Sequence, residues 1–280
     1  MAHDNSCTLM IVMSAEERFM AGILAREDRS DRFEAVMNLI KPHVSSILDL
    51  GCGIGSLASL LAERFPSASI LGIDRSRFLL EQLKCKRMKP GITVVLAEAP
   101  LFPLRPKSFD IVVAVQVLHE IFHFMGKQEL MLTIRNVYDL LRKGGRFIVL
   151  DHRNPEDAAI SVCLSRELLE TLHHFKQRFK PRRISYEILD KEWIRISMRD
   201  FYDFVTKIWA MDTDLEEEEM HETHTPFTEQ EFAHFCQEAG FRVNSVANLT
   251  PISGHLEYYK IRVKTNLRLP ERHFIVDARK

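Results

Sequence analysis

A glycine-rich turn that begins with an acid is the part of this sequence best suited to chemistry. The turn runs from Asp49 to Gly55 and holds three glycines, Gly51, Gly53 and Gly55. Glycine lets the chain turn sharply and lets a ligand lie against the backbone, because no Cβ stands in the way. A second apolar run ends at Asp74, where a carboxylate can accept both hydroxyls of a ribose. The spacing therefore predicts a site for a nucleotide-like cofactor.

The charge of Asp49 distinguishes between two classes of cofactor. A carboxylate repels a pyrophosphate but attracts an ammonium or a sulfonium group. A dinucleotide site would also prefer glycine or alanine at position 56, where this chain has Ser56. These residues favour S-adenosylmethionine, which is a sulfonium, over a nicotinamide cofactor. A nicotinamide-dependent oxidoreductase is the less favoured hypothesis.

The elements that must hold this turn follow the pattern of an α/β sheet. Short apolar runs alternate with helical segments from Ser46 onward, which is typical of βαβ units and a parallel sheet. The predicted strands are 46–50, 69–73, 93–97, 109–115, 146–150, 241–246 and 273–278. The predicted helices between them are 55–65, 77–86, 129–141 and 228–239. The turn would then lie at the carboxyl edge of the first strand.

The segments outside this pattern are predicted to be helical. Residues 1–43 would form two helices, Ala15–Arg26 and Ser30–Ile40, that cover the core. Residues 153–226 are predicted to form a helical insertion. From about 156 to 225 they show no convincing strand but hold the aromatic-rich amphipathic stretches 158–179 and 184–209. Such an insertion could serve as a substrate lid or as a dimer interface. The α/β core would comprise residues 44–152 and 227–280.

Two further segments complete a resemblance to a known family. Residues 108–120 and 140–147 match the fourth strand, and the approach to the fifth strand, of class I S-adenosylmethionine-dependent methyltransferases. With the glycine turn, the chain resembles in particular the small-molecule branch that includes the ubiquinone and menaquinone biosynthesis methyltransferases. The resemblance implies a doubly wound, Rossmann-like, mostly parallel seven-stranded sheet with an antiparallel last strand, here carrying the helical insertion. It also implies S-adenosyl-L-methionine as the cofactor.

The resemblance further implies which residues hold that cofactor. The turn from Asp49 to Gly55 would hold the methionine end, and Asp74 would hold the ribose. Glu98 stands where the family usually has an aspartate that contacts the adenine amine. The expected cofactor-binding residues are Asp49, Gly51, Cys52, Gly53, Gly55, Asp74, Arg75, Glu98, Ala99 and Gln116.

Catalysis of methyl transfer depends mainly on placing the acceptor, and on a base where the acceptor must lose a proton. His119 is the favoured base and His152 the second candidate, although a histidine at position 119 could merely pack near the cofactor. His221, Glu222 and His224 could close over the pocket or form a solvated turn. As metal ligands these three form a weak pattern with no cysteine near them, so the sequence predicts no metal site.

These features predict a methyltransferase that acts at O, C or N of a small apolar or aromatic molecule. The alternatives are a non-catalytic S-adenosylmethionine-binding or scaffold protein, and an RNA or protein methyltransferase. Residues 114–117 lack the Asn/Asp-Pro-Pro-Tyr/Phe motif, which argues against the methyltransferases that modify exocyclic amines of DNA or glutamine of proteins. A helical insertion rich in aromatic residues also allows a homodimer.

Composition narrows the choice of partners and of compartment. Thirty-eight lysines and arginines balance 39 aspartates and glutamates, so no overall field favours nucleic acid or an anionic membrane. No run approaches the roughly 18 apolar residues of a spanning helix, and Met1–Met13 lacks the basic start of a secretory signal. Five scattered cysteines are typical of reduced thiols. The expected location is the cytoplasm.

Overall fold

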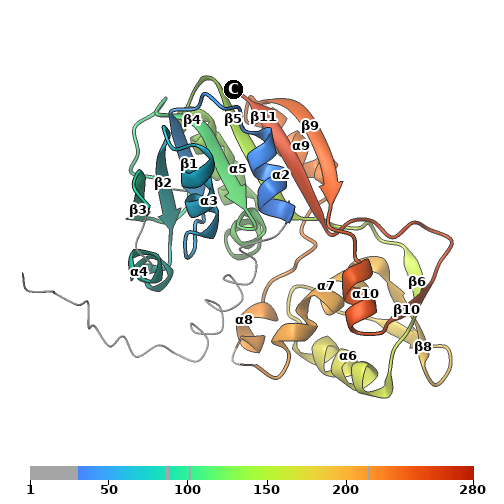
Figure 1. Cartoon of the computed structure of the whole chain (residues 1–280). Coiled ribbons are helices and arrows are strands. Elements are labelled where there is room, and N and C mark those ends of the chain that lie inside the picture. Colours follow the sequence, from blue (N-terminus) through green and yellow to red (C-terminus); the bar gives the residue numbers. More distant parts are fainter. Residues whose placement is uncertain (1–30, 86–88, 101, 214) are drawn as a thin grey trace, which may run out of the picture.

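A computed structural model describes residues 31–85, 89–100, 102–213 and 215–280 (Figure 1). The predicted helix at Ala15–Arg26 lies outside these residues. The second predicted N-terminal helix is present as α2 (Asp31–Leu39). None of the helices in the described ranges is both long and apolar enough to cross a membrane.

A seven-stranded sheet forms the centre of the fold, in the order β3-β2-β1-β4-β5-β11-β9. Its strands are β1 (Ser46–Leu50), β2 (Ser69–Asp74), β3 (Ile92–Leu96), β4 (Phe109–Val115), β5 (Leu141–His152), β9 (Arg242–Leu249) and β11 (His273–Arg279). Strands β1 to β5 pair in parallel, whereas β11 is antiparallel to both of its neighbours. The predicted fold class is therefore confirmed, and each predicted strand of the core is present.

Helices cover both faces of this sheet because its strands are apolar on both sides. In β1, Ile47 belongs to the core under α2 and α3 (Ser56–Arg64), whereas Leu48 belongs to the core under α5 (Leu118–Leu140) and α9 (Glu229–Glu238). Alternate residues of a strand point to opposite faces, so such a strand is buried twice. The remaining helix of the α/β core is α4 (Arg77–Cys85).

The helix α5 is longer than the sequence predicted. It begins at Leu118 rather than at residue 129, and its backbone is non-helical at Gly126, where φ is 88°. Glycine adopts a positive φ readily, so Gly126 divides the element, and the sequence predicted only the part after it. The first of these turns follows β4 directly, so it places His119 and Glu120 at the carboxyl edge of the sheet.

The insertion is a second unit with its own sheet, which corrects the prediction that residues 156–225 hold no strand. The sheet has the order β10-β6-β8-β7. Its strands are β6 (Ala159–Cys163), β7 (Tyr186–Ile188), β8 (Trp193–Ser197) and β10 (Arg262–Lys264), and its helices are α6 (Arg166–Arg178), α7 (Met198–Lys207), the 3₁₀ helix η1 (Ile208–Ala210), α8 (Glu216–Glu219) and α10 (Ser253–Tyr258). Strands of three to five residues carry too few alternations to show a period of two beside longer helices.

The second unit also takes residues from the segment predicted as core. Strand β10 pairs antiparallel with β6, and Ile252 and Ile261 belong to the same buried cluster as Phe175 and Phe204. The chain therefore leaves the α/β core after β9 and returns to it at β11 (Figure 1). The sequence pattern did not reveal this departure from the core, because α10 and β10 are only six and three residues long.

Candidate functional site

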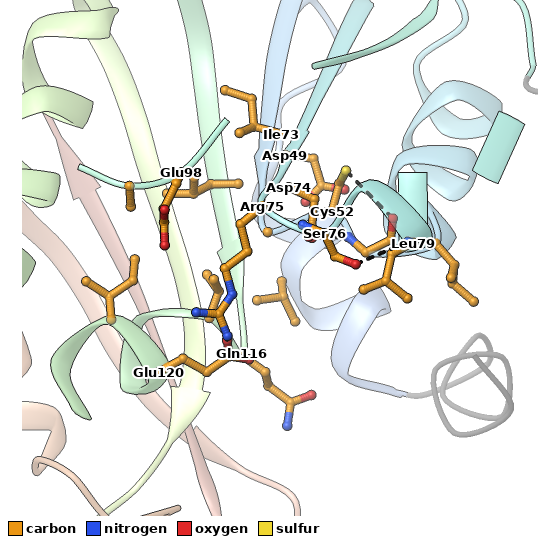
Figure 2. Close-up of a pocket in the computed structure, with 18 of the residues that line it drawn as sticks. Asp49, Cys52, Ile73, Asp74, Arg75, Ser76, Leu79, Glu98, Gln116 and Glu120 are labelled. Carbon is orange, nitrogen blue, oxygen red and sulfur yellow. Dashed lines mark hydrogen bonds and ion pairs between the residues drawn. The ribbon is translucent and has the colours of Figure 1, made fainter. Parts of the chain in front are cut away.

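A cavity of about 620 Å³ opens at the carboxyl ends of β1, β2 and β4, beside the glycine turn (Figure 2). Strand β1 pairs with β2 on one side and β4 on the other, so the chain order reverses at this point of the sheet. Ligands of open α/β sheets bind at such switch points. The predicted cofactor residues that line the cavity are Asp49, Gly51, Cys52, Gly53, Asp74, Arg75, Glu98, Ala99 and Gln116.

Gly55 is the one predicted cofactor residue that does not line the cavity. Its φ is +77°, and a Cβ built on it would lie 2.3 Å from Cδ1 of Leu83. Gly55 therefore shapes the turn and lets α4 pack against it. The turn itself is tied to β2, because the N–H groups of Gly51 and Cys52 donate to the carbonyl of Ile73 at 2.8 and 2.9 Å.

Asp49 is the most unusual group in the cavity wall. Its side chain is 2% exposed, and its Oδ2 is buried with no hydrogen-bond partner among the described residues. Burial, and then the negative charge of Asp74, raises the pKa of Asp49 to about 7. A buried acceptor without a donor is rare, because it costs free energy unless something pairs with it. An ammonium group in the cavity would supply both the donor and the opposite charge.

Asp74 ends β2 on the same side of the cavity (Figure 2). Its Oδ2 accepts from the N–H of Gly53 and its Oδ1 from the N–H of Ser76, both at 2.8 Å. These two bonds fix the carboxylate and leave each oxygen with a lone pair for a ligand hydroxyl. The geometry fits a ribose held by its two hydroxyls.

The side chain of Arg75 reaches from beside Asp74 to Glu120 at the start of α5 (Figure 2). Their side chains form an ion pair at 3.4 Å, in which both groups are partly exposed (Figure 2). Glu98 and Ala99 follow β3 and line the same wall, as the sequence predicted. Glu98 is exposed, so its carboxylate can accept a hydrogen bond from the amine of a ligand in the cavity.

Gln116 closes the floor of the cavity behind β4. It has a positive φ of 52°, which an L-residue adopts only where its surroundings hold it. Its Oε1 accepts from Arg32 at 2.9 Å, and its Nε2 lies 3.0 Å from Nε2 of His152 and 3.4 Å from Nε2 of His273. The amide therefore links α2 to the ends of β5 and β11.

The two predicted catalytic histidines are buried beside the cavity rather than in its lining. His119 Nδ1 lies 2.6 Å from Oδ1 of Asp151, and the N–H groups of Leu118 and His119 both donate to Asp151 Oδ2. Burial, the largest influence, lowers the pKa of His119, but the charge and hydrogen bond of Asp151, with Glu222, outweigh it and raise that pKa to about 9. The carboxylates of Asp151 and Glu222 therefore favour the protonated form of His119 in the empty site.

His152 has the opposite electrostatic character. Its ring stacks on that of His224 at 4.2 Å with an interplanar angle of 3°. Burial, followed by the neighbouring histidines, holds the pKa of His152 well below its ordinary value. The same ring lies 4.9 Å from the ring of His119. The structure thus brings together the two predicted bases and one histidine of the predicted closing segment.

The second unit contributes one wall of the cavity, of which sequence reasoning identified only Glu222. Leu215, Glu218, Glu219 and Glu222 line the cavity from the side opposite the sheet. Apolar lining from the core side comes from Phe33, Phe124 and Met125. Glu218 and Glu219 belong to a run of four glutamates that shows no motif in the sequence, and only the fold places them at the cavity. His221, by contrast, is partly exposed and does not line the cavity.

Comparison with known proteins decides the family. The methyltransferase domain family matches residues 43–239, which is more than half of the chain. The chain belongs to this family. Family and fold together confirm the predicted class I S-adenosylmethionine-dependent methyltransferase and its cofactor.

Curated relatives match about half of this methyltransferase. A ubiquinone/menaquinone biosynthesis C-methyltransferase of Desulfotalea psychrophila is 28% identical over 132 residues, or 47% of this chain and 51% of the relative. A phthiotriol/phenolphthiotriol dimycocerosates methyltransferase of Mycobacterium tuberculosis is 31% identical over 144 residues, or 51% of this chain and 48% of the relative. The chain thus spans about half the length of these relatives.

Solved structures share the fold of this methyltransferase at low sequence identity. An S-adenosylmethionine-dependent methyltransferase from Mesorhizobium loti has a TM-score of 0.57 and 18% identity, over 90% of this chain and 99% of that one. Human N-acetylserotonin methyltransferase, in complex with S-adenosylmethionine, has a TM-score of 0.53 and 15% identity, over 95% of this chain and 55% of that one.

Proposed function

We propose that this methyltransferase moves the methyl group of S-adenosylmethionine to O, C or N of a small apolar or aromatic molecule. The observation that carries the proposal is the carboxyl of Asp49, a residue that lines the cavity and whose buried Oδ2 has no hydrogen-bond partner among the described residues. A carboxylate there suits the ammonium of a methionine moiety and would repel a phosphate. It therefore favours a sulfonium cofactor over a dinucleotide.

Each end of the cofactor has a proposed partner. Asp49 and the glycine turn would hold the methionine end, Asp74 the ribose, and Glu98 the adenine amine. The cofactor, when bound, supplies a methyl group that is open to in-line attack by the acceptor. The protein's part is to hold the two reactants at attack distance and to keep water out.

The acceptor is proposed to be apolar because of the residues that face the remaining part of the cavity. Phe33, Phe124, Met125 and Leu215 provide an apolar lining from both units. Curated relatives are named for ubiquinone and menaquinone biosynthesis and for phthiotriol dimycocerosates, which supports acceptors of this kind. Residues 215–222 would act as the lid over this region.

His119 and His152 stay the proposed bases for an acceptor that must lose a proton. Asp151 fixes the orientation of the His119 ring, and Gln116 that of His152. Neither histidine lines the cavity, so the assignment of the base is tested separately from that of the cofactor.

The test is methyl transfer from S-adenosylmethionine with a labelled methyl group, run against a panel of phenols, quinols and amines. We expect label in at least one acceptor, and none with the Asp74→Ala variant at the same cofactor concentration. Glu170→Gln, which changes a 70% exposed side chain on α6, is the matched control. RNA and protein are tested as acceptors in the same assay. Cofactor binding without methyl transfer to any of these acceptors would instead support a scaffold protein.

A homodimer through the second unit is also proposed. Strand β7 is an edge of the smaller sheet, and Ile188 and Leu189 beside it are 62% and 43% exposed. An apolar edge strand is suited to pairing with a second copy. Light scattering after size exclusion should give a dimer mass for the wild type and a monomer mass for Ile188→Asp, whereas a monomeric wild type would contradict the proposal.

Neither nucleic acid nor a membrane is proposed as a partner, because the net charge is −1. The proposed location is the cytoplasm. Its support is that Cys52, Cys163 and Cys236 are buried, free thiols, which suits a reducing compartment.

A further inference from the structure

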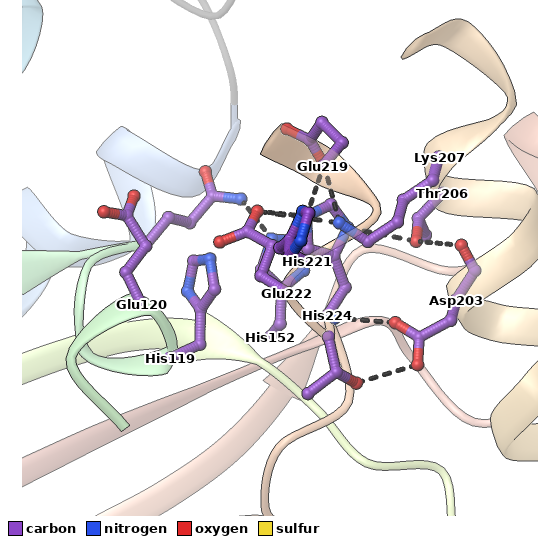
Figure 3. Close-up of polar contacts among 12 residues, drawn as sticks. His119, Glu120, His152, Asp203, Thr206, Lys207, Glu219, His221, Glu222 and His224 are labelled. Atoms are coloured by element: carbon purple, nitrogen blue, oxygen red, sulfur yellow. Dashed lines mark hydrogen bonds and ion pairs between the residues drawn. The ribbon is translucent and has the colours of Figure 1, made fainter. Parts of the chain in front are cut away.

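A buried cluster of imidazole and carboxylate groups lies where the second unit meets the α/β core (Figure 3). His119 comes from the start of α5, whereas Glu222 and His224 come from the segment between α8 and α9. Their exposed fractions are 4%, 8% and 9%. More than 100 residues of sequence separate the two sides, which is why Glu222 and His224 alone formed only a weak metal pattern.

The free nitrogens of the two histidines face a common region. His224 Nε2 lies 3.5 Å from Glu222 Oε1, and a ring nitrogen of His119 lies within 4.8 Å of one of His224. Figure 3 shows the His119 ring directed toward Glu222. Ligand atoms of a tetrahedral ion with bonds of about 2.0–2.1 Å lie roughly 3.3 Å apart, which is close to the first of these separations. Small rotations of side chains would close the second.

The opposite nitrogen of each ring is already held by an acceptor. His119 Nδ1 lies 2.6 Å from Oδ1 of Asp151, and His224 Nδ1 lies 3.1 Å from Oγ1 of Thr206. Histidines that bind metals are generally oriented in this way, because a partner on one nitrogen directs the lone pair of the other toward the ion. Both rings are thus presented through Nε2.

We propose that His119, His224 and Glu222 bind a divalent transition-metal ion at the wall of the cofactor cavity. Two imidazoles and one carboxylate form a ligand set that suits zinc, iron or manganese and leaves positions open. Glu222 also lines the cavity, so the open positions of the ion would face the space in which the cofactor and acceptor meet.

Glu219 and His152 also lie near these ligand atoms, but each has another partner. Lys207 is fully buried, and its Nζ lies 2.6 Å from Oε2 of Glu219 but 3.6 Å from Oε1 of Glu222. Glu219 is therefore paired with Lys207, and Glu222 is held less closely. His152 lies within the same 4.8 Å of its two histidine neighbours, but its Nε2 is 3.0 Å from Nε2 of Gln116 and its ring is stacked on that of His224. In the proposed site His152 is not a ligand, and its stacked ring fixes the plane of His224.

Metal binding by the full chain tests the proposal, with protein that carries no histidine tag and has been treated with a chelator. Equilibrium dialysis against zinc chloride should give one ion per chain. His224→Ala and Glu222→Gln should each weaken binding at least tenfold, and cobalt in place of zinc should give absorption bands of a histidine-ligated site. His234→Ala, which removes a 64% exposed histidine on α9, should bind zinc like the wild type.

Two further measurements keep the result interpretable. Circular dichroism with chelator shows whether each variant is folded, and zinc should raise the Tm of the wild type but not that of a folded His224→Ala protein. His152→Phe, which preserves the ring stack, should keep the ion. No bound zinc in the wild type, undiminished binding in His224→Ala and Glu222→Gln, or loss of zinc in His152→Phe would each overturn the assignment. Since neither cofactor nor acceptor is present, these outcomes do not depend on the proposed methyl transfer.

Discussion

Asp49 and Asp74 line the same cavity beside the glycine turn, and the charge of Asp74 makes the buried carboxyl of Asp49 harder to ionise. Burial is the larger of the two causes, and together they raise the pKa of Asp49 to about 7. This pair would meet the cofactor at two points, its ammonium and its ribose. Their electrostatic coupling leads to two predictions about pH.

Cofactor affinity should rise with pH through the neutral range. Asp49 is mostly protonated below its pKa of about 7 in the empty site, and only its charged form pairs with an ammonium. Binding should therefore release a proton near pH 6.5, and affinity should fall as the pH is lowered further. Calorimetry in buffers of different ionisation enthalpy measures this proton. An affinity for S-adenosylhomocysteine that is flat from pH 5.5 to 8 would contradict the role of Asp49.

Stability of the cofactor-free protein should show the opposite pH dependence at this residue. The folded pKa of Asp49 lies above its ordinary value of 3.8, so the native state binds more protons than the unfolded state between about pH 4 and 7. The free energy of unfolding therefore decreases as the pH rises through this window, by at most roughly 4 kcal/mol from this group. Asp49→Asn should raise the Tm at pH 7.5 while weakening cofactor binding, as differential scanning calorimetry can determine. A lower Tm for the variant would be the contrary result.

Gly55 should be required for the turn although it does not touch the cavity. Gly55→Ala places a Cβ against Leu83 at a positive φ, so the free energy of unfolding should fall by about 1–3 kcal/mol. Gly254→Ala is the matched control, because no heavy atom lies within 4 Å of the Cβ it would add. Urea denaturation of both variants measures the difference, and equal stabilities would contradict the prediction.

His119→Ala should separate turnover from cofactor binding. The side chain is held by Asp151 and does not line the cavity, so the Kd for S-adenosylmethionine should change little. Turnover should fall by roughly 10²–10⁴-fold if His119 handles a proton of the acceptor. The labelled-methyl assay and calorimetry are run on the same preparation. An unchanged rate would remove His119 from the site, and loss of binding alone would make its role structural.

Sequence pattern predicted the sheet well because its strands are buried on both faces and end in turns with distinct chemistry. The strand Phe109–Val115 and the turn after β1 needed no tertiary information, since apolar runs and glycines are local signals. The second unit was missed where β6 and β10 pair across about 100 residues, because each strand is too short to show its own period. His119 and Glu222 likewise meet only in the fold.

Calorimetric titration with S-adenosylmethionine tests the central claim most directly. The wild type should bind one equivalent, Asp49→Asn and Asp74→Ala should each bind at least tenfold more weakly, and Glu170→Gln should bind like the wild type. Absence of binding by the wild type, or undiminished binding by both cavity variants, would contradict the assignment of the cofactor to the turn between Asp49 and Gly55.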